Sequence, residues 1–554
     1  MRFPNSSSRD VFVFGALLLS LTAAACRDRA PKPAGTEGGI LREALFSDPA
    51  SFDPRAQVDA GTYGIMYAMY NTLAELDDSL RVTPALARGW ETADQRTWRF
   101  HLRSDAFFHP DSCFGAAGRS RAMKSRDVVF SLNRALAPGA VGSFMLTDIV
   151  QGASDVSEGK AKTASGIRTL NDSTVEIVLL KPYGKLPVRL AAPFFFVVPQ
   201  DVVTCRGEQF ARRPVGTGPF MLQRLVAGRG VTLTRNPRYW KKDGDGKSLP
   251  YLSGVEYRVM GDPQVALTEF RGGRLDAVEV PPVLSSMVLN RGRPAGAYQR
   301  YTVKEVVAVD VHFLAFRMDQ VPFREEPKLR QALNYAVDKE QIANVLLNGL
   351  ATPARGVLPP AVYPEAGQAA AYPYDPERAK RLLAEAGFPG GRGLPELVLN
   401  IDDQVTTETV AQFVQSNLAA VGVRIRINKA DFNTLLAEVS KGSHPFYYMF
   451  WEGTDPNPEI FMVQFKSDLL PEKGGYNFGR YRNPRVDSLY EAAVVTLDER
   501  QSRSIWLQLE RTLVEDAPWL FLYHTRRVRL LQPGVSGYPH NPLQIRRFET
   551  TRIR

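Results

Sequence analysis

The sequence predicts an α/β protein. Segments with the period-two alternation of half-buried strands alternate along the chain with segments whose apolar residues recur every three or four positions, as in amphipathic helices. Of the 554 residues, 44% are hydrophobic and 23% are charged, whereas disordered chains are poorer in apolar residues. No internal repeat with a period of roughly 20–50 residues is present, which argues against a solenoid or a propeller.

Strand-like segments and one helix are predicted in the first half of the chain. Residues 39–46 form a strand-like run, and residues 97–103 and 173–180 alternate apolar and polar side chains. Between the last two segments, residues 125–136 predict a helix, because apolar residues recur every four positions and Ser125 suits an N-cap.

Helices with clear start or stop signals are predicted in the second half. Asp375 and Asn483 each precede a proline, which is the pattern of an N-cap followed by a first-turn proline. Asp498 and Gln501 form a capping-box pattern. The predicted helices span residues 327–336, 375–387, 483–493 and 498–514, and the strand-like segments 396–401 and 423–427 alternate with them.

Composition excludes several classes of protein. The chain has 69 Lys and Arg against 59 Asp and Glu, a net charge of +10, but no concentrated basic stripe of the kind that binds nucleic acid. Its Cys and His residues form no CxxC or HxxxH pair, and GxSxG, HExxH and dinucleotide-binding motifs are absent. We therefore expect no nucleic-acid partner, no metal, no cofactor and no enzymatic activity.

The N-terminus carries an export signal. Arg2 and Arg9 precede an apolar run over residues 11–25. A basic start, an apolar core and small residues at its end are typical of a secretory signal peptide, which we place at residues 1–25.

The residues around the cleavage site predict a lipid anchor. Ala23 to Cys26 resembles a bacterial lipobox, with Ala23 at the position where Leu is usual. We expect cleavage before Cys26 and lipidation of Cys26, which would hold the mature protein at the membrane in the periplasm or at the cell surface. Conventional cleavage without a lipid is the alternative. Residues 26–37 predict a flexible tether, because they contain Pro, Gly and charges without apolar periodicity.

Export changes the interpretation of the two remaining cysteines. In an oxidising compartment, Cys113 and Cys205 could form a disulfide that closes a long loop. Two unpaired thiols remain the alternative, because the sequence does not give the distance between them.

A series of short motifs runs in the same order along nearly the whole mature chain and resembles one family. These are the solute-binding lipoproteins of ABC importers that take up peptides, dipeptides, nickel and related solutes, solute-binding family 5. The motifs are Ser51–Pro54, Tyr70–Leu73, Pro84–Trp90, Trp98–Arg103, Asp127–Ser131, Pro214–Phe220, Arg235–Trp240 and Arg330–Asp338.

The resemblance implies a two-lobed periplasmic binding protein fold, type II-like, with a ligand cleft between the lobes and an extra inserted domain. Lobe I would comprise residues 38–75, 166–309 and 521–554, the inserted domain residues 76–165, and lobe II residues 310–520. The chain would cross between the lobes near residues 309 and 520, and these crossings would act as hinges.

The resemblance also implies a ligand site in the stretch Phe450–Pro458, which includes Trp451 and Asn457. In the family, the Trp lines the pocket and an Asp three residues later binds the free amine of a peptide. Here Thr454 occupies that position and Asp455 comes one residue later. Either the loop is shifted and Asp455 takes the role, or the amine anchor is missing; the two prolines that follow keep their register without a gap, which favours its loss.

The same resemblance places a second ligand contact at Val58-Asp59-Ala60, a loop that would offer backbone groups to an extended ligand.

We therefore predict a monomeric extracytoplasmic binding protein that captures an oligopeptide-like solute and delivers it to the permease subunits of an ABC importer. A receptor for a non-peptide solute, such as an opine, a sugar derivative or a metal chelate, is an alternative. A secreted lipoprotein hydrolase that uses Asp455 or another cleft carboxylate is a further alternative, and a chaperone-like surface protein is another.

Overall fold

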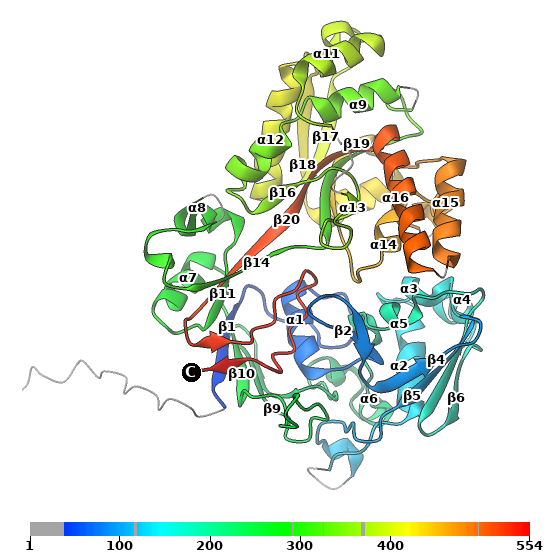
Figure 1. Ribbon diagram of the computed structural model, residues 1–554, viewed down its shortest axis with the longest axis vertical. Helices are drawn as coiled ribbons and strands as arrows, with labels where there is room; N and C mark the ends of the chain where they lie inside the picture. The colour runs from blue at the N-terminus through cyan, green and yellow to red at the C-terminus, as the bar shows by residue number, and fades with distance from the viewer. Residues whose placement is uncertain are drawn as a thin grey trace, which may run out of the picture. The chain divides into compact units, whose positions relative to one another are not determined.

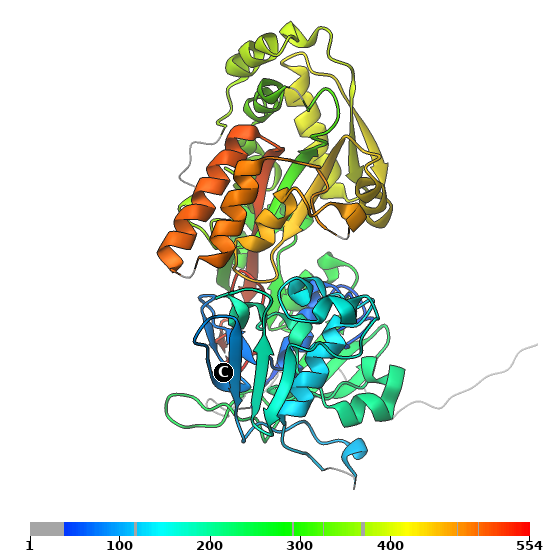
Figure 2. The same cartoon turned by 90° about the vertical axis from the view of Figure 1, so that its right-hand side faces the viewer.

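The computed structural model describes residues 38–554, with gaps at 116–118, 291–292, 325, 367–371, 474 and 497. Figures 1 and 2 show two views of it. The predicted signal peptide, Cys26 and the predicted tether lie outside the described residues. We call the part whose main core is built from residues 41–277 and 531–548 lobe I, and the part whose core is built from residues 309–523 lobe II.

Lobe I contains a mixed sheet. β1 (Ile40–Leu45) pairs in parallel with β10 (Gly254–Val259) and β11 (Ala277–Glu279), and β9 (Gly230–Arg235) and β8 (Phe220–Val226) extend the sheet antiparallel beyond β10. Further elements in this part are α1 (Ala60–Met69), β2 (Ala74–Leu76), β3 (Val82–Pro84), α5 (Leu186–Arg189), α6 (Gln200–Arg206), α7 (Pro263–Arg271), α8 (Ser285–Val288), β12 (Leu289–Asn290), β13 (Arg293–Pro294), β21 (Val535–Ser536) and β22 (Arg552–Ile553).

A second sheet of lobe I is small and antiparallel. Its strands lie in the order β4 (Ala87–Glu91), β5 (Thr97–Leu102), β7 (Thr174–Val178) and β6 (Ile167–Asn171). The predicted strands 97–103 and 173–180 are β5 and β7. The predicted helix 125–136 is α2 (Ser125–Leu136), which packs on this sheet and is followed by α3 (Phe144–Thr147) and α4 (Ala153–Ser157).

The predicted cap of α2 is wrong by one residue. The N-cap position belongs to Lys124, and its backbone N–H donates to the Asp127 carboxylate at 3.0 Å. Ser125 is the first helical residue, and its hydroxyl donates to the carbonyl of Asn171 instead. The side chain is therefore used for a contact with β6 that the sequence does not reveal.

Lobe II places helices around a second group of strands. The strand order is β18 (Ile425–Ala430), β17 (Leu397–Asp402), β19 (Phe446–Glu452), β15 (Asp310–Phe316) and β20 (Trp519–Leu531). The other elements are α9 (Pro327–Tyr335), α10 (Lys339–Gln341), β16 (Ala351–Pro353), α11 (Pro376–Glu385), α12 (Val405–Ala419), α13 (Phe432–Lys441), α14 (Glu459–Met462), α15 (Pro484–Val495) and α16 (Glu499–Asp516).

In lobe II, the residues that the sequence marks as helix starts do cap helices. The Asp375 carboxylate accepts the N–H of Arg378 at the start of α11, and the Asp498 carboxylate accepts that of Gln501 at the start of α16. Asn483 caps α15 in the same way, with Pro484 as the first helical residue. The α/β fold class is thus confirmed.

β20 belongs to both lobes. Up to Thr525 it pairs with β15 and β16, and from Arg526 it pairs with β14 (Thr302–Val307) and, further along, with β11. The second chain crossing therefore falls at residues 525–526 rather than near 520. The first crossing is the short link between β14 and β15, at residues 308–309. Figure 1 shows β20 running from one group of strands into the other.

The cores follow the two lobes, with one difference from the predicted organisation. Buried residues of the predicted inserted domain, such as Phe100 and Leu132, belong to the same continuous apolar core as Leu41 and Val255. The boundaries of an inserted domain at residues 76 and 165 remain a prediction, but the segment shares its core with lobe I.

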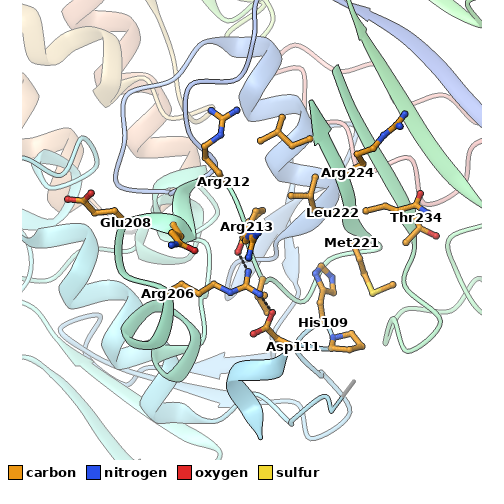
Figure 3. A pocket seen from close by; sticks show the side chains of 16 residues that line it. His109, Asp111, Arg206, Glu208, Arg212, Arg213, Met221, Leu222, Arg224 and Thr234 are labelled. Carbon is orange, nitrogen blue, oxygen red and sulfur yellow. Dashed lines mark hydrogen bonds and ion pairs between the residues drawn. The ribbon is translucent and has the colours of Figure 1, made fainter. Parts of the chain in front are cut away.

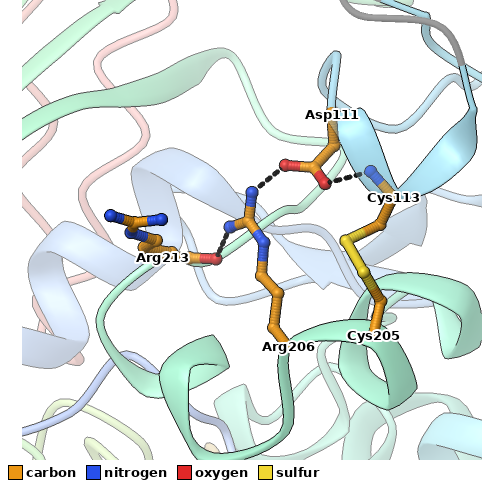
Figure 4. Close-up of a disulfide and its surroundings, with 5 residues drawn as sticks. All are labelled: Asp111, Cys113, Cys205, Arg206 and Arg213. Atoms are coloured by element: carbon orange, nitrogen blue, oxygen red, sulfur yellow. Dashed lines mark hydrogen bonds and ion pairs between the residues drawn. A yellow bond between two sulfur atoms is a disulfide. The ribbon is translucent and has the colours of Figure 1, made fainter.

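A disulfide joins Cys113 to Cys205, with their Cα atoms 6.1 Å apart, and ties the loop before α2 to α6. As Figure 4 shows, the neighbouring Asp111 carboxylate accepts the N–H of Cys113 at 2.9 Å and pairs with Arg206. Because the bridge closes a loop of 92 residues, it restricts the unfolded chain. Among the described helices, none is long and apolar enough to cross a bilayer.

Candidate ligand-binding site

The predicted ligand segment begins at the boundary between the lobes. Its first residues belong to β19, and directly after this strand the N–H of Gly453 donates to the carbonyl of Val309 at 2.7 Å, beside the first crossing. A Cβ on Gly453 would lie 2.7 Å from Cγ1 of Val309 and 3.0 Å from Cε2 of Phe461. Glycine therefore permits the close approach that turns residues 451–460 along the edge of lobe II.

Trp451 holds this segment together. Its indole N–H donates to the carbonyl of Ile460 at 2.7 Å, and its ring lies edge-on against Tyr476, with the ring centres 5.3 Å apart. The side chain is only partly buried. Trp451 thus closes the loop from 451 to 460 and remains partly exposed.

Aromatic rings form a continuous row from lobe I to lobe II. Tyr63 of α1 contacts Phe194, Phe194 contacts Phe144 of α3, Phe144 contacts Tyr476, and Tyr476 contacts Trp451. Phe144 packs against both large cores. The row therefore connects the lobes through apolar contacts. Aromatic side chains bury a large area in such contacts.

Asp455 is buried, with 1% of its surface exposed. One carboxylate oxygen accepts the N–H of Asn457 at 2.8 Å. The other oxygen and the Thr454 hydroxyl have no hydrogen-bond partner among the described residues. Burial raises the pKa of Asp455 to about 6, an effect that the nearby Arg189 partly offsets.

A buried polar cluster joins the lobes beside this acid. The Arg189 guanidinium of α5 pairs with the Glu459 carboxylate of α14 at 2.7 Å, and the Tyr183 hydroxyl donates to the same carboxylate at 2.8 Å. The Asn457 amide donates to Tyr183 and to Glu459, and the Tyr490 hydroxyl donates to Glu459. We call these five residues the Arg189–Glu459 cluster.

Val58-Asp59-Ala60 lies in lobe I, at the start of α1. Val58 is buried, and the Asp59 carboxylate caps α1 by accepting the N–H and the hydroxyl of Thr62. Asp59 and Ala60 line a hollow of about 190 Å³, to which Arg527 of β20 also contributes. We call it the Arg527 hollow.

The Arg527 hollow is rich in charges. Arg527 pairs with Glu452 at 2.9 Å, and its Nε is buried without a partner among the described residues. Arg529 pairs with Glu279 at 2.6 Å. Although burial opposes it, the nearby arginines Arg529 and Arg527 lower the pKa of Glu279 to about 2.

A larger hollow of about 620 Å³ lies on the far side of the ligand segment. Lobe I contributes residues of α3, α4 and α5, and lobe II contributes residues of α14 and α15 and the loop that carries Tyr476. Figure 1 shows α3, α4 and α5 facing α14 and α15. We call it the Tyr476 hollow.

A third hollow, of about 1100 Å³, lies within lobe I, between the disulfide region and β8. Figure 3 shows Arg206 bound to Asp111 there, with Arg212, Arg213 and Arg224 around it. The last three side chains are exposed to solvent. Lobe II contributes no residue to its lining, so it is a surface feature of one lobe and not part of the boundary.

Comparison with known proteins identifies the family. The sequence profile of the bacterial extracellular solute-binding proteins, family 5, matches residues 81–469, more than half of the chain. The chain belongs to this family. A di/tripeptide-binding protein of Pseudomonas aeruginosa is 27% identical over 98% of this chain and 99% of its own length. Heme-binding protein A of Haemophilus influenzae is 26% identical over 89% and 88%.

Solved structures have the same fold as this family 5 protein. HbpA2 of Haemophilus parasuis superposes with a TM-score of 0.77 at 22% identity, covering 93% of this chain and all of that chain. The periplasmic binding protein DppA of Helicobacter pylori, solved with the peptide STSA, gives a TM-score of 0.75 at 22% identity, covering 94% and 98%. The two-lobed fold expected from the motifs is therefore confirmed.

The structure of this family 5 protein separates the predicted ligand residues into groups. Trp451 lies in β19, and Thr454, Asp455 and Asn457 lie in the loop that follows it; of these four residues only Trp451 and Thr454 are partly exposed. Asp59 and Ala60 line the Arg527 hollow, whose Arg527 pairs with Glu452 of the ligand segment, whereas Val58 does not line it. Their roles in binding remain predictions, and Asp59 already serves as a helix cap.

Sequence reasoning missed the polar side chains that join the lobes. Glu459 stands directly after the ligand segment, so its position was a usable signal. Tyr183 and Arg189 both bond to Glu459, but they come from a segment 270 or more residues away in the sequence. No local pattern links such distant residues. Among the described residues, no group of His, Cys, Asp and Glu could hold a metal ion.

Proposed function

We propose that the chain is an extracytoplasmic binding protein that captures an oligopeptide-like solute between its lobes and delivers it to an ABC importer. The observation that carries this proposal is full-length similarity to a protein named as di/tripeptide-binding, over 98% of this chain. The ligand segment at the lobe boundary supports it, because a solute held there touches both lobes.

Closure would follow from the two crossings. Lobe II is connected to lobe I through the link at residues 308–309 and through β20. A few backbone torsions at such positions can absorb a domain movement. A solute that contacts both lobes stabilises the closed state by the difference between its affinities for the two states. No catalytic step is needed for this work, and we assign none.

An extended ligand fits the layout of the boundary. Residues 451–460 run from the Arg527 hollow, which Glu452 reaches, to the Tyr476 hollow, which Glu459 and Ile460 line. Asp59 and Ala60 line the Arg527 hollow at the first end. Such a ligand would be read along its length by backbone contacts and at its ends by the two hollows.

We further propose that this protein has no carboxylate that anchors the free amine of a peptide, because Thr454 occupies the position of that carboxylate. The Thr454 hydroxyl is neutral, and the Asp455 carboxylate is buried, bonded to the backbone of Asn457 and close to Arg189. A ligand ammonium placed here would compete with Arg189 for that acid. We therefore expect N-acetylated and free peptides to bind with similar affinity.

For location, we propose that Cys26 carries a lipid that holds the mature protein at the membrane, in the periplasm or at the cell surface, as a monomer. Mass spectrometry of the intact mature protein tests this directly. A diacylglycerol-modified Cys26 at the N-terminus is the expected result, and an unmodified N-terminus would contradict it.

The function is tested by identifying the solute. Purified protein is denatured, and released small molecules are identified by mass spectrometry; calorimetry with di-, tri- and tetrapeptides, free and N-acetylated, then measures affinity. We expect peptides to be released and rebound without turnover. Failure of every peptide to bind, or hydrolysis of a bound peptide, would reject the proposal. A strong preference for free amines would reject only the statement about Thr454.

A further inference from the structure

The Tyr476 hollow adjoins the ligand segment but is distinct from it. None of the predicted ligand residues lines it. Trp451 touches it indirectly, because its ring contacts Tyr476 and its indole N–H binds Ile460, and both of these residues are in the lining. A ligand lying along residues 451–460 therefore reaches this hollow at one end.

The inner wall of the hollow carries charges that already have partners. The Arg189 guanidinium and the Glu459 carboxylate neutralise each other, and the hydroxyls of Tyr183 and Tyr490 donate to Glu459. Lys466, 9% exposed, pairs with Glu491 and lies near Asp468 and Asp487. A charged ligand group would therefore lose water here without gaining a free counter-charge.

The remaining lining offers apolar surface from both lobes. Phe144 comes from lobe I, and Val463, Leu469, Tyr476 and Val494 come from lobe II. All five side chains are only partly buried. A ligand group that fills the space would remove this surface from water, which favours binding in proportion to the apolar area covered.

The size of the hollow suits a substantial group. Its volume of about 620 Å³ is within the range of roughly 300–1000 Å³ typical of small-molecule sites. The charged side chains in its lining that are exposed, such as Lys181 and Glu158, lie where the lobe surfaces meet solvent. The exposed charges of the lining thus face water, whereas its buried charges are paired with other side chains.

We propose that the Tyr476 hollow binds an uncharged, largely apolar group at one end of the solute, either an aromatic or aliphatic side chain or an acyl chain. This inference rests on the proposed function, because it assumes a solute that lies along residues 451–460. Apolar surface from both lobes would thus select the end group of the solute. Solutes with a charged group at that end would bind less well.

Calorimetry with a matched peptide set tests the inference. Trialanine is compared with tripeptides carrying one Phe at the first or last position, with N-octanoyl-trialanine, and with the same peptides carrying Asp or Lys in place of Phe. We expect at least one apolar end group to raise affinity about tenfold or more over trialanine. The charged replacements should give no gain.

Two neighbouring valines provide the matched variants. Val494 lines the hollow, whereas Val495, the next residue of α15, is 43% exposed and does not. Val494→Trp should narrow the hollow and lower the gain from the apolar end group while leaving trialanine affinity within about twofold. Val495→Trp should retain the gain. Leu469→Trp, on the facing loop, replaces Val494→Trp if thermal unfolding shows that the latter does not fold.

The outcomes separate this inference from the proposed function. If trialanine binds but no apolar end group improves affinity, or if the gain survives both Val494→Trp and Leu469→Trp, the inference is wrong and the proposed function stands. If no peptide in the set binds the wild-type protein, the proposed function is wrong and the inference falls with it.

Discussion

The Arg527 hollow and the Tyr476 hollow, at the two ends of the ligand segment, differ in the charges that their linings leave free. At the Arg527 hollow, charged side chains line the space and Arg527 keeps one buried N–H without a partner among the described residues. At the Tyr476 hollow, the buried charges are bonded to one another and apolar side chains face the space. The Arg527 hollow can therefore pair with polar or charged groups, whereas the buried charges of the Tyr476 hollow already have partners.

The acids at the two ends show the same contrast. Although burial opposes it, Arg529 and Arg527 lower the pKa of Glu279 to about 2, whereas burial raises the pKa of Asp455 to about 6. Burial alone therefore does not set the charge state of an acid in this protein. The number and position of the surrounding guanidinium groups decide it.

Breaking the neutralised end should have the largest effect. Glu459→Ala leaves the Arg189 guanidinium buried without its counter-charge, so we expect the free energy of unfolding to fall by about 3–5 kcal/mol. Urea denaturation followed by tryptophan fluorescence measures the change.

Two variants control for this result. Glu491→Ala removes an exposed partner of Lys466 and should cost no more than about 1 kcal/mol. The double variant Arg189→Met with Glu459→Met removes both buried charges and should recover most of the loss. Equal losses in the single and double variants would mean that the pair does not act as an ion pair.

The acid beside the cluster should make stability depend on pH. Because the folded-state pKa of Asp455 lies above the unfolded value, the folded protein binds the extra proton, and stability falls as pH rises from about 4 to about 6. Asp455→Asn should remove a fall on the order of 3 kcal/mol across that window. Urea midpoints of both proteins, measured at several pH values, give the difference; parallel curves would contradict the pKa.

The aromatic row should matter for binding more than for folding. Trp451→Ala removes ring surface between the two hollows, so we expect affinity for the bound solute to weaken by about 2 kcal/mol or more, about thirtyfold. Trp451→Phe keeps a ring and loses only the hydrogen bond to Ile460, so its loss should be smaller. Unchanged affinity together with lost stability would assign Trp451 to the core.

The charged end should show the opposite pH dependence at a smaller magnitude. The pKa of Glu279 lies below its unfolded value, so its contribution is present above about pH 4.5 and is lost as pH falls toward about 2. Solvent screens the part of the side chain that is exposed, 30%. Glu279→Gln should therefore cost about 1–2 kcal/mol at neutral pH and nothing near pH 2. A constant cost at all pH values would exclude this origin.

Much of the fold could be predicted because its signals are local. Asp375, Asn483 and Asp498 cap the helices that their sequence patterns predict, and the alternation of residues 97–103 became β5. The cap of α2 could not be predicted in the same way. Ser125 had a competing acceptor in Asn171, which is distant in sequence and adjacent only after folding.

The candidate site could be predicted only in part. The resemblance led to Trp451 and its loop, in which Gly453 bonds to Val309 at the first crossing between the lobes. It gave no information on Arg189 or Tyr476, which determine the charge and shape of the space next to that loop. These contacts depend on side chains from separate elements, and one sequence carries no pattern that pairs them.

The sequence by itself determined the α/β class, the caps of α11, α15 and α16, and the family, because each depends on the order and spacing of residues along the chain. The tertiary structure decided that β20 joins both lobes, that Asp455 is buried beside Arg189, and that the two ends of the ligand segment differ in free charge. The physical reason is that charge neutralisation and burial are properties of neighbours in space, and most of these neighbours come from distant parts of the chain.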